Sequence, residues 1–222
     1  MWITEGGYNC LQDYGLRLWD NDIIKTAIET GDPRPIEEAL REYHDVAVTA
    51  GGVLYQKVSA YDDPAKRHLA RATVAAVGDL VVYSRRSGHP DDEETWILKT
   101  KRLHPALHQL GTRRKLVTNA DDKYYAFLKT AADRSERILV VLNYQPSLQT
   151  IDIDMSGIAA SGLLDLESGE LIVPRNHFEV ELPVYGNQFH QNALPSIRLP
   201  SLRVELPAYG YRFYQVFPMK KG

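Results

Sequence analysis

The spacing of apolar residues changes once along the chain, and this change constrains the fold more than any other feature. In the first half, apolar residues recur every three or four positions or gather in short runs, a pattern typical of helices alternating with buried parallel strands. After Gly111, the segments KLVTN, KYYAFLKTA and ERILVVLNYQ are rich in β-formers, with turn residues between them. The sequence therefore predicts an α+β protein, with a helix-rich partial α/β domain over 1–108 and an antiparallel β-sandwich over 109–222.

The elements of the first half are bounded by residues that favour helix ends. Gly31 follows an amphipathic stretch and ends it, and Pro105 disfavours helix at His104 just before it. Acidic residues next to Pro64 are typical of a helix start. Together these signals predict helices over 16–31, 33–48, 62–78 and 93–104, and strands over 53–61 and 79–84.

Composition argues against several classes of function. The formal net charge of −3 disfavours general nucleic-acid binding, and we interpret the basic cluster at 113–115 as a solvated entrance to a strand. Cys10 is the only cysteine, so no intrachain disulfide and no cysteine zinc site can form. The histidines form no helical ligand pair, and Gly6-Gly7 and Gly51-Gly52 lack the frame of a phosphate loop. We therefore expect no metal and no cofactor.

The remaining composition is that of an ordinary soluble protein. Apolar residues make up 44% of the 222 residues, which is enough for a sizeable core. The chain shows neither the features of a signal peptide at its start nor an apolar run of the roughly 18 residues that a membrane span needs. We expect a cytoplasmic protein with no membrane partner.

Several motifs in the middle and second half follow an order known from one enzyme family. The run LHPAL at 103–107 is followed by Ala126-Phe127, by LVVLN at 139–143 and by LPAYGY at 206–211. This series resembles the end of the α-amylase family (glycoside hydrolase family 13), in which the last barrel helix leads into a C-terminal β-sandwich. The resemblance covers about residues 96–216. It implies that the first half is a truncated part of a TIM-type (β/α)₈ barrel.

The same resemblance implies roles for residues of the first half. In WITEGG, Glu5 takes the place of the family's general acid/base, and in VSAYDDPAKR Asp62 takes the place of the aspartate that stabilises the transition state. Tyr61 stands where the family has a histidine, and Arg67 follows as a substrate-binding residue. The implied activity is hydrolysis of α-glucosidic bonds in an α-glucan or oligosaccharide.

Other interpretations of these residues stay open. Retaining glycosidases need two carboxyl groups about 5 Å apart, and the family's nucleophile motif has no match in this chain. Asp62-Asp63 before Pro64 also fits a helix N-cap, and Glu5 near a chain end fits a solvated residue. The alternative function is therefore a non-catalytic carbohydrate-binding or structural remnant. A partial barrel also leaves parallel strand edges uncovered, which favours a homo-oligomer.

The closing motif of the chain occurs twice, as VELPVYGNQFHQ over 180–191 and as VELPAYGYRFYQ over 204–215. The second copy matches the family pattern better, so we expect residues 204–216 to take one strand position in the sandwich. The chain also contains many tyrosines. Four aromatic residues are candidates either for a sugar-stacking platform or for core packing: Trp96, Tyr124, Tyr144 and Tyr185.

Overall fold

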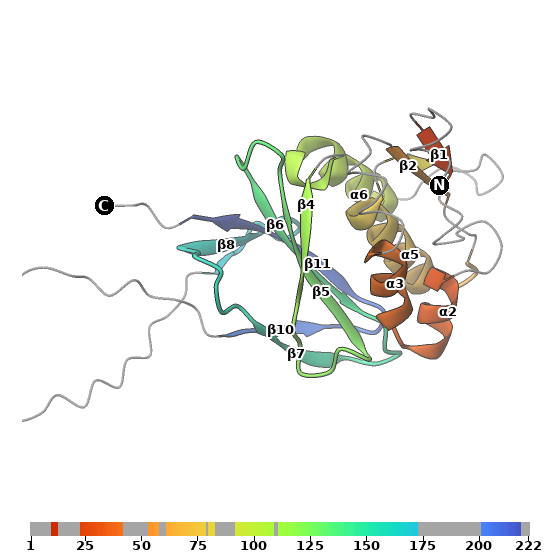
Figure 1. Ribbon diagram of the computed structural model, residues 1–222. Coiled ribbons are helices and arrows are strands. Elements are labelled where there is room, and N and C mark those ends of the chain that lie inside the picture. Colours follow the sequence, from red (N-terminus) through yellow and green to blue (C-terminus); the bar gives the residue numbers. More distant parts are fainter. Residues whose placement is uncertain are drawn as a thin grey trace, which may run out of the picture.

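A layer of helices covers one face of a large antiparallel sheet, and a smaller sheet lies on its other face (Figure 1). The computed structural model describes residues 10–12, 23–41, 53–57, 61–78, 80–82, 92–108, 111–172 and 201–218. The predicted mixture of helices and antiparallel sheet is confirmed within these ranges. None of the helices in these ranges has the length and hydropathy needed to cross a membrane.

The helices begin and end where local signals place them. Gly31 has a φ of +78° and donates its N–H to the carbonyl of Ala27 at 2.8 Å, which ends the first helix. The helix before Pro105 ends at Leu103, one residue before the predicted end. The bounds are α2 (Ile23–Thr30), α3 (Arg34–Ala39), α5 (Pro64–Val77) and α6 (Asp92–Leu103), with a short 3₁₀ helix η3 (Pro105–Leu107).

Three short parallel strands form a separate sheet on the helical side. They are β1 (Cys10–Gln12), β2 (Val53–Lys57) and β3 (Leu80–Val82), and they lie in the order β1-β2-β3. Helices α2 and α3 connect β1 to β2, and α5 connects β2 to β3. The order along the sheet therefore equals the order along the chain. Strands β2 and β3 lie inside the predicted ranges, whereas β1 was not predicted, because three residues show no periodicity.

The second half forms two antiparallel sheets. A six-stranded sheet has the order β4-β5-β6-β11-β8-β9, and a two-stranded sheet pairs β10 with β7. The bounds are β4 (Thr112–Leu116), β5 (Tyr124–Thr130), β6 (Arg137–Asn143), β7 (Gln149–Asp154), β8 (Gly162–Asp165), β9 (Leu171–Ile172), β10 (Ser201–Leu206) and β11 (Tyr211–Phe217).

The second copy of the closing motif occupies two strand positions rather than one. Its first part is β10, which pairs with β7, and its last part is β11, which pairs with β6 and β8. A turn at 207–210 carries the chain from one sheet to the other. The prediction of a single position was wrong because the proline and glycine of the motif interrupt the strand. The first copy, over 180–191, lies outside the described residues.

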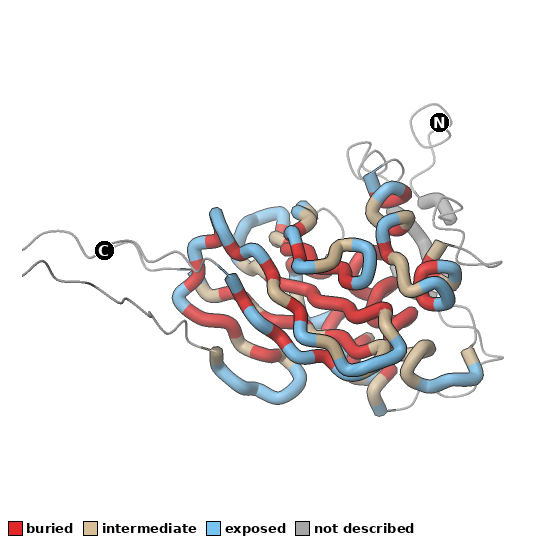
Figure 2. Tube along the Cα trace, turned by 90° about the horizontal axis from the view of Figure 1, so that it is seen from below, coloured by how far each residue is buried: buried red, intermediate tan, exposed pale blue. Residues whose placement is uncertain are grey.

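Buried side chains form two cores on the two faces of the large sheet. One core lies between the helices and that sheet and includes Leu69 and Val74 of α5 with Phe127 and Phe213 of the sheet. The other lies between the two antiparallel sheets. Figure 2 shows the buried residues in the interior and the exposed ones at turns and rims. The predicted division at residues 108 and 109 falls between η3 and β4, and residues on both sides of it share the first core.

The sequence predicted a solvated basic cluster at 113–115, but one of its side chains is buried. The side chain of Arg113 is only 4% exposed, and its Nη1 is 2.5 Å from the carboxylate of Glu37 on α3. Lys115 pairs with Asp121 at 2.6 Å. The prediction was wrong for Arg113 because it packs against a helix far away in the sequence.

Candidate functional site

The segment that enters helix α5 contains three of the four predicted site residues. It follows strand β2 and includes Tyr61 and Asp62, with Arg67 one turn into the helix. Asp62 is exposed, and it makes no hydrogen bond or ion pair to the described part of the chain. Glu5, the fourth predicted residue, lies outside the described residues.

Asp63, rather than Asp62, caps the helix. Its backbone is extended, and its Oδ1 accepts a hydrogen bond of 2.9 Å from the N–H of Ala65. Pro64 takes the first helical position, where its missing N–H costs nothing. The helix-cap interpretation of the acidic pair therefore holds for Asp63, and the catalytic interpretation stays a prediction for Asp62. One carboxylate holds the helix start, and that of Asp62 is left exposed beside it.

Arg67 holds the segment in place from inside the helix. Its Nη1 donates a hydrogen bond of 3.2 Å to the carbonyl of Tyr61, and its Nε donates one of 2.9 Å to Glu94 on α6. The Tyr61 side chain is half-buried and packs against the helical core. The structure thus brings Tyr61 and Arg67 together, through a backbone contact.

A buried carboxylate next to the segment was missed by the sequence analysis. The Glu94 side chain is 4% exposed and lies between the guanidinium groups of Arg67 and Arg71. The attraction to the two cations offsets the desolvation free energy of this buried carboxylate, and the ion pairs join α5 to α6. A signal for it exists in the sequence, because arginines four positions apart share one face of a helix.

Two aromatic candidates for a sugar platform are buried, and a third, Trp96, is half-buried against the helical core. Tyr144 is fully buried, and its hydroxyl shares a hydrogen bond of 2.8 Å with Thr73. Tyr124 is buried, and Trp96 lies 6.3 Å from Tyr211, measured between stacked ring centroids. The core interpretation is correct for Trp96, Tyr124 and Tyr144. The fourth candidate, at position 185, lies outside the described residues.

The described residues do not bring together three or more histidine, cysteine, aspartate or glutamate side chains as a metal site would. What they do offer is one exposed carboxylate, that of Asp62, held beside the start of α5 by a backbone that Arg67 and Asp63 fix. A carboxylate on a backbone held in this way can stabilise a developing positive charge on a bound substrate. It can also accept hydrogen bonds from hydroxyl groups.

The chain matches no family model and no curated protein sequence. Solved structures resemble it in fold. AmyP in complex with maltose matches with a TM-score of 0.68 at 14% identity, over 100% of this chain and 54% of that chain. The α-amylase of Geobacillus thermoleovorans complexed with acarbose gives 0.66 at 12% identity, over 99% and 51%.

A third similar structure is the maltogenic α-amylase AmyB of Thermotoga neapolitana, with a TM-score of 0.61 at 13% identity over 96% of this chain and 51% of that one. The chain therefore spans about half the length of the structures that it matches. At this level of identity, the likeness establishes a fold shared with about half of each of these proteins.

Proposed function

We propose that the chain is the C-terminal part of an α-amylase-type glycoside hydrolase that acts on α-glucosidic bonds of glucans or oligosaccharides. In this proposal, the parallel strands with their helices are consecutive units of a (β/α)₈ barrel, and the two antiparallel sheets are the C-terminal β-sandwich. The observation that carries it is the sheet order β1-β2-β3, with helices between successive strands, in a chain that aligns almost entirely with α-amylase structures.

The place of Asp62 in the topology supports a catalytic role. In (β/α)₈ barrels, active sites lie at the C-terminal ends of the strands, in the segments that lead into the helices. Asp62 lies in such a segment, after β2 and before α5, and it is exposed. In the proposed mechanism its carboxylate stabilises the positive charge that develops on the sugar ring when the glycosidic bond breaks.

Tyr61 and Arg67 are proposed to bind or position the substrate. The hydrogen bond from Arg67 to the Tyr61 carbonyl fixes the backbone next to Asp62. This contact and the ion pair with Glu94 already occupy Nη1 and Nε of the guanidinium. We therefore propose that Arg67 acts mainly by holding Asp62 in position.

The complete reaction needs further groups. A retaining mechanism uses a nucleophile and an acid/base, for which Glu5 is the proposed acid/base. No residue of the chain matches the family's nucleophile motif, so we propose that additional barrel strands from outside these 222 residues complete the site. Strands β1 and β3 lie at the ends of the three-stranded order, and each has one strand partner in the described part of the chain. A second copy is proposed to pair at these edges and form a homo-oligomer. Because an identical copy lacks the same motif, this pairing would cover the strand edges without supplying the nucleophile.

The test is hydrolysis of maltooligosaccharides by the wild type and by the Asp62→Asn variant. Asp63→Asn is a matched control, because it removes the same charge one position away and asparagine also caps helices well. We expect Asp62→Asn to lower kcat at least about a hundredfold and Asp63→Asn to leave it within about threefold. Equal rates for Asp62→Asn and wild type would refute the proposed site.

Two further measurements separate the parts of the proposal. Glu5→Gln should abolish hydrolysis while binding of maltotriose persists. Light scattering across a concentration series should show a dimer or larger species, and a strict monomer would refute the proposed pairing of strand edges. Saccharide binding without hydrolysis at any concentration would instead identify a non-catalytic binding module.

A further inference from the structure

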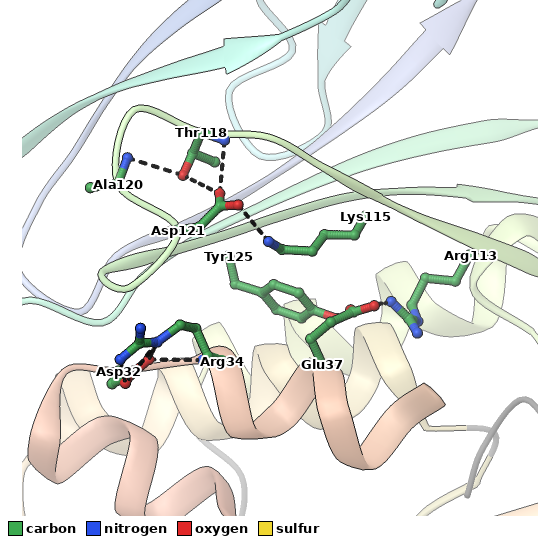
Figure 3. Close-up of polar contacts among 9 residues, drawn as sticks. All are labelled: Asp32, Arg34, Glu37, Arg113, Lys115, Thr118, Ala120, Asp121 and Tyr125. Carbon is green, nitrogen blue, oxygen red and sulfur yellow. Dashed lines mark hydrogen bonds and ion pairs between the residues drawn. The ribbon is translucent and has the colours of Figure 1, made fainter. Parts of the chain in front are cut away.

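A polar pocket lies between helix α3 and the edge of the large sheet, at the junction of the helical and sheet layers. Its volume is about 470 Å³. Figure 3 shows α3 on one side of this space and β4, β5 and the connecting turn on the other. The residues that line it are Pro33, Arg34, Glu37, Glu38, Arg41, Lys115, Asp121 and Tyr125.

The floor of the pocket is fixed by a buried hydrogen-bond network. The Glu37 carboxylate accepts hydrogen bonds of 2.5 Å from Nη1 of Arg113 and from the hydroxyl of Tyr125. Arg113 and Tyr125 are almost completely buried. Burial raises the pKa of Tyr125 well above its ordinary value, so its hydroxyl stays protonated and donates. Glu37 is thus held in one orientation before any ligand arrives.

The wall on the sheet side is fixed in the same way. The Oδ2 of Asp121 accepts a hydrogen bond of 2.6 Å from Lys115, and its Oδ1 accepts two of 2.8 Å from the N–H and hydroxyl of Thr118 (Figure 3). Arg34 on the opposite side is bound by Asp32. The carboxylates of Glu37 and Asp121 are therefore preorganised, which lowers the entropy cost of binding to them.

The charges that line the pocket balance. Three cationic side chains, those of Arg34, Arg41 and Lys115, face three carboxylates, those of Glu37, Glu38 and Asp121. An anion such as a phosphate group would meet the carboxylates, and a cation would meet the guanidinium groups. A neutral ligand carries neither penalty. The lining therefore selects for a neutral molecule that both donates and accepts hydrogen bonds.

Hydroxyl groups of a sugar meet this requirement. Each one donates to a carboxylate and accepts from a guanidinium or ammonium group. Glu38 and Arg41 are exposed and line the pocket, so one offers an acceptor and the other a donor to the hydroxyls of a bound sugar. The volume falls within the range of about 300–1,000 Å³ that is usual for small-molecule sites.

We propose that this pocket is a second saccharide-binding site for a short neutral oligosaccharide, on a face of the protein formed by α3 and the β4–β5 connection and distinct from the Asp62 segment. Its saccharide class rests on the proposed function. The location of the site, and the expectation that its ligand is neutral and forms hydrogen bonds, rest on the pocket alone. Bound there, an oligosaccharide bridges the helical layer and the sheet.

The test is a titration of the 222-residue chain with maltotriose, followed by amide chemical shifts and by calorimetry. The variant Glu38→Ala/Arg41→Ala removes one acid and one base from the pocket without touching its buried network. Its control is Lys25→Ala/Glu29→Ala on α2, which removes an exposed pair of opposite charge at 3.8 Å. We expect a loss of affinity of at least about tenfold for the pocket variant and about none for the control.

Further arms distinguish the possible results. Glucose 6-phosphate and glucosamine should bind more weakly than glucose, and tighter binding of either would overturn the neutral-ligand proposal. Unchanged maltotriose affinity in the pocket variant would overturn the site, provided thermal unfolding shows that the variant is folded. A loss of affinity only in Asp62→Asn would do the same while supporting the proposed function. Pocket-dependent binding without hydrolysis would support the site and not the activity.

Discussion

The hydroxyl of Tyr211 on β11 donates a hydrogen bond of 2.5 Å to the carboxylate of Glu93 on α6. Glu93 also lies 3.2 Å from Nδ1 of His68 on α5, and the Trp96 ring stacks on that of Tyr211. Burial, with a further contribution from Glu93, raises the pKa of Tyr211, so the hydroxyl remains a donor. Strand β11 is therefore attached to α6 by a polar contact as well as by aromatic packing, and Glu93 links this contact to α5.

Removing the Tyr211 hydroxyl should weaken this attachment. We expect Tyr211→Phe to lower the free energy of unfolding by about 1.5–2 kcal/mol, the lower part of the range for hydrogen bonds to charged groups, because Glu93 is partly exposed and water can replace the hydroxyl. Urea denaturation of the variant and the wild type measures this loss in the free energy of unfolding. Tyr209→Phe is the matched control, since the Tyr209 hydroxyl has no hydrogen-bond partner in the described part of the chain. Equal losses in both variants would contradict the expected role.

Lys101 stabilises the end of helix α5 from the neighbouring helix. Its ammonium group is buried and donates hydrogen bonds to the carbonyls of Ala75 at 3.0 Å, Gly78 at 2.5 Å and Leu107 at 2.8 Å. Lys101→Met keeps the aliphatic stem but leaves these carbonyls without their donor. We expect a loss of about 2–4 kcal/mol by urea denaturation. The exposed Lys99→Met should change stability by less than about 0.5 kcal/mol, and a similar loss there would contradict the capping role.

Alanine substitutions at two glycines with left-handed backbone conformation can distinguish the cost of backbone strain from the cost of a steric clash. Gly31 and Gly169 have φ values of +78° and +73°, so alanine at either position costs about 1–2 kcal/mol. A Cβ at Gly169 meets nothing within 4 Å, whereas one at Gly31 lies 2.8 Å from Nε2 of Gln145. That Nε2 donates a hydrogen bond to the Gly31 carbonyl, which the displaced side chain would lose.

Gly31→Ala should therefore be more destabilising than Gly169→Ala by about 1 kcal/mol. The double variants with Gln145→Ala provide the check by thermal or urea unfolding. With Gln145 removed, the two glycine substitutions should cost the same. A persistent difference would show that the contact with Gln145 is not its cause.

Local features of the fold were predictable from the sequence, because their causes are local. The end of α2 at Gly31 and the end of α6 just before Pro105 follow from backbone preferences of single residues. The strand at 53–57 and the hairpin of β5 and β6 follow from composition and turns. In contrast, the three residues of β1 carry too little pattern to predict, and the two-sheet path of the closing motif depends on which strands are available to pair with it.

The candidate site was predictable only in part. The resemblance singled out Asp62, which is exposed and lies between β2 and α5, and its role stays a prediction. Which of Asp62 and Asp63 caps the helix depends on backbone geometry that the sequence leaves open. The contact of Arg113 with Glu37 joins residues 76 positions apart. Such a pair, and with it the polar pocket, follows from tertiary packing and not from any local pattern.

Asp121 should make the protein sensitive to acid. Burial alone would raise its pKa, but hydrogen bonds from Lys115 and Thr118 outweigh that effect and hold the pKa below its ordinary value of 3.8. A carboxyl group with a depressed pKa contributes stability above the unfolded-state pKa and loses it as the pH falls through the folded-state value. The wild type should therefore lose this contribution below about pH 4.

Asp121→Asn removes the titrating group, so it should lower the free energy of unfolding at neutral pH. The difference in this free energy between the variant and the wild type should shrink as the pH falls from about 6 to about 2.5. Urea midpoints at each pH measure this difference. Asp122→Asn is the control, because it removes an exposed carboxylate at the adjacent position, and the difference between the two variants isolates the contacts that Asp121 makes. A difference for Asp121→Asn that did not change with pH would show that the ion pair with Lys115 does not stabilise the turn.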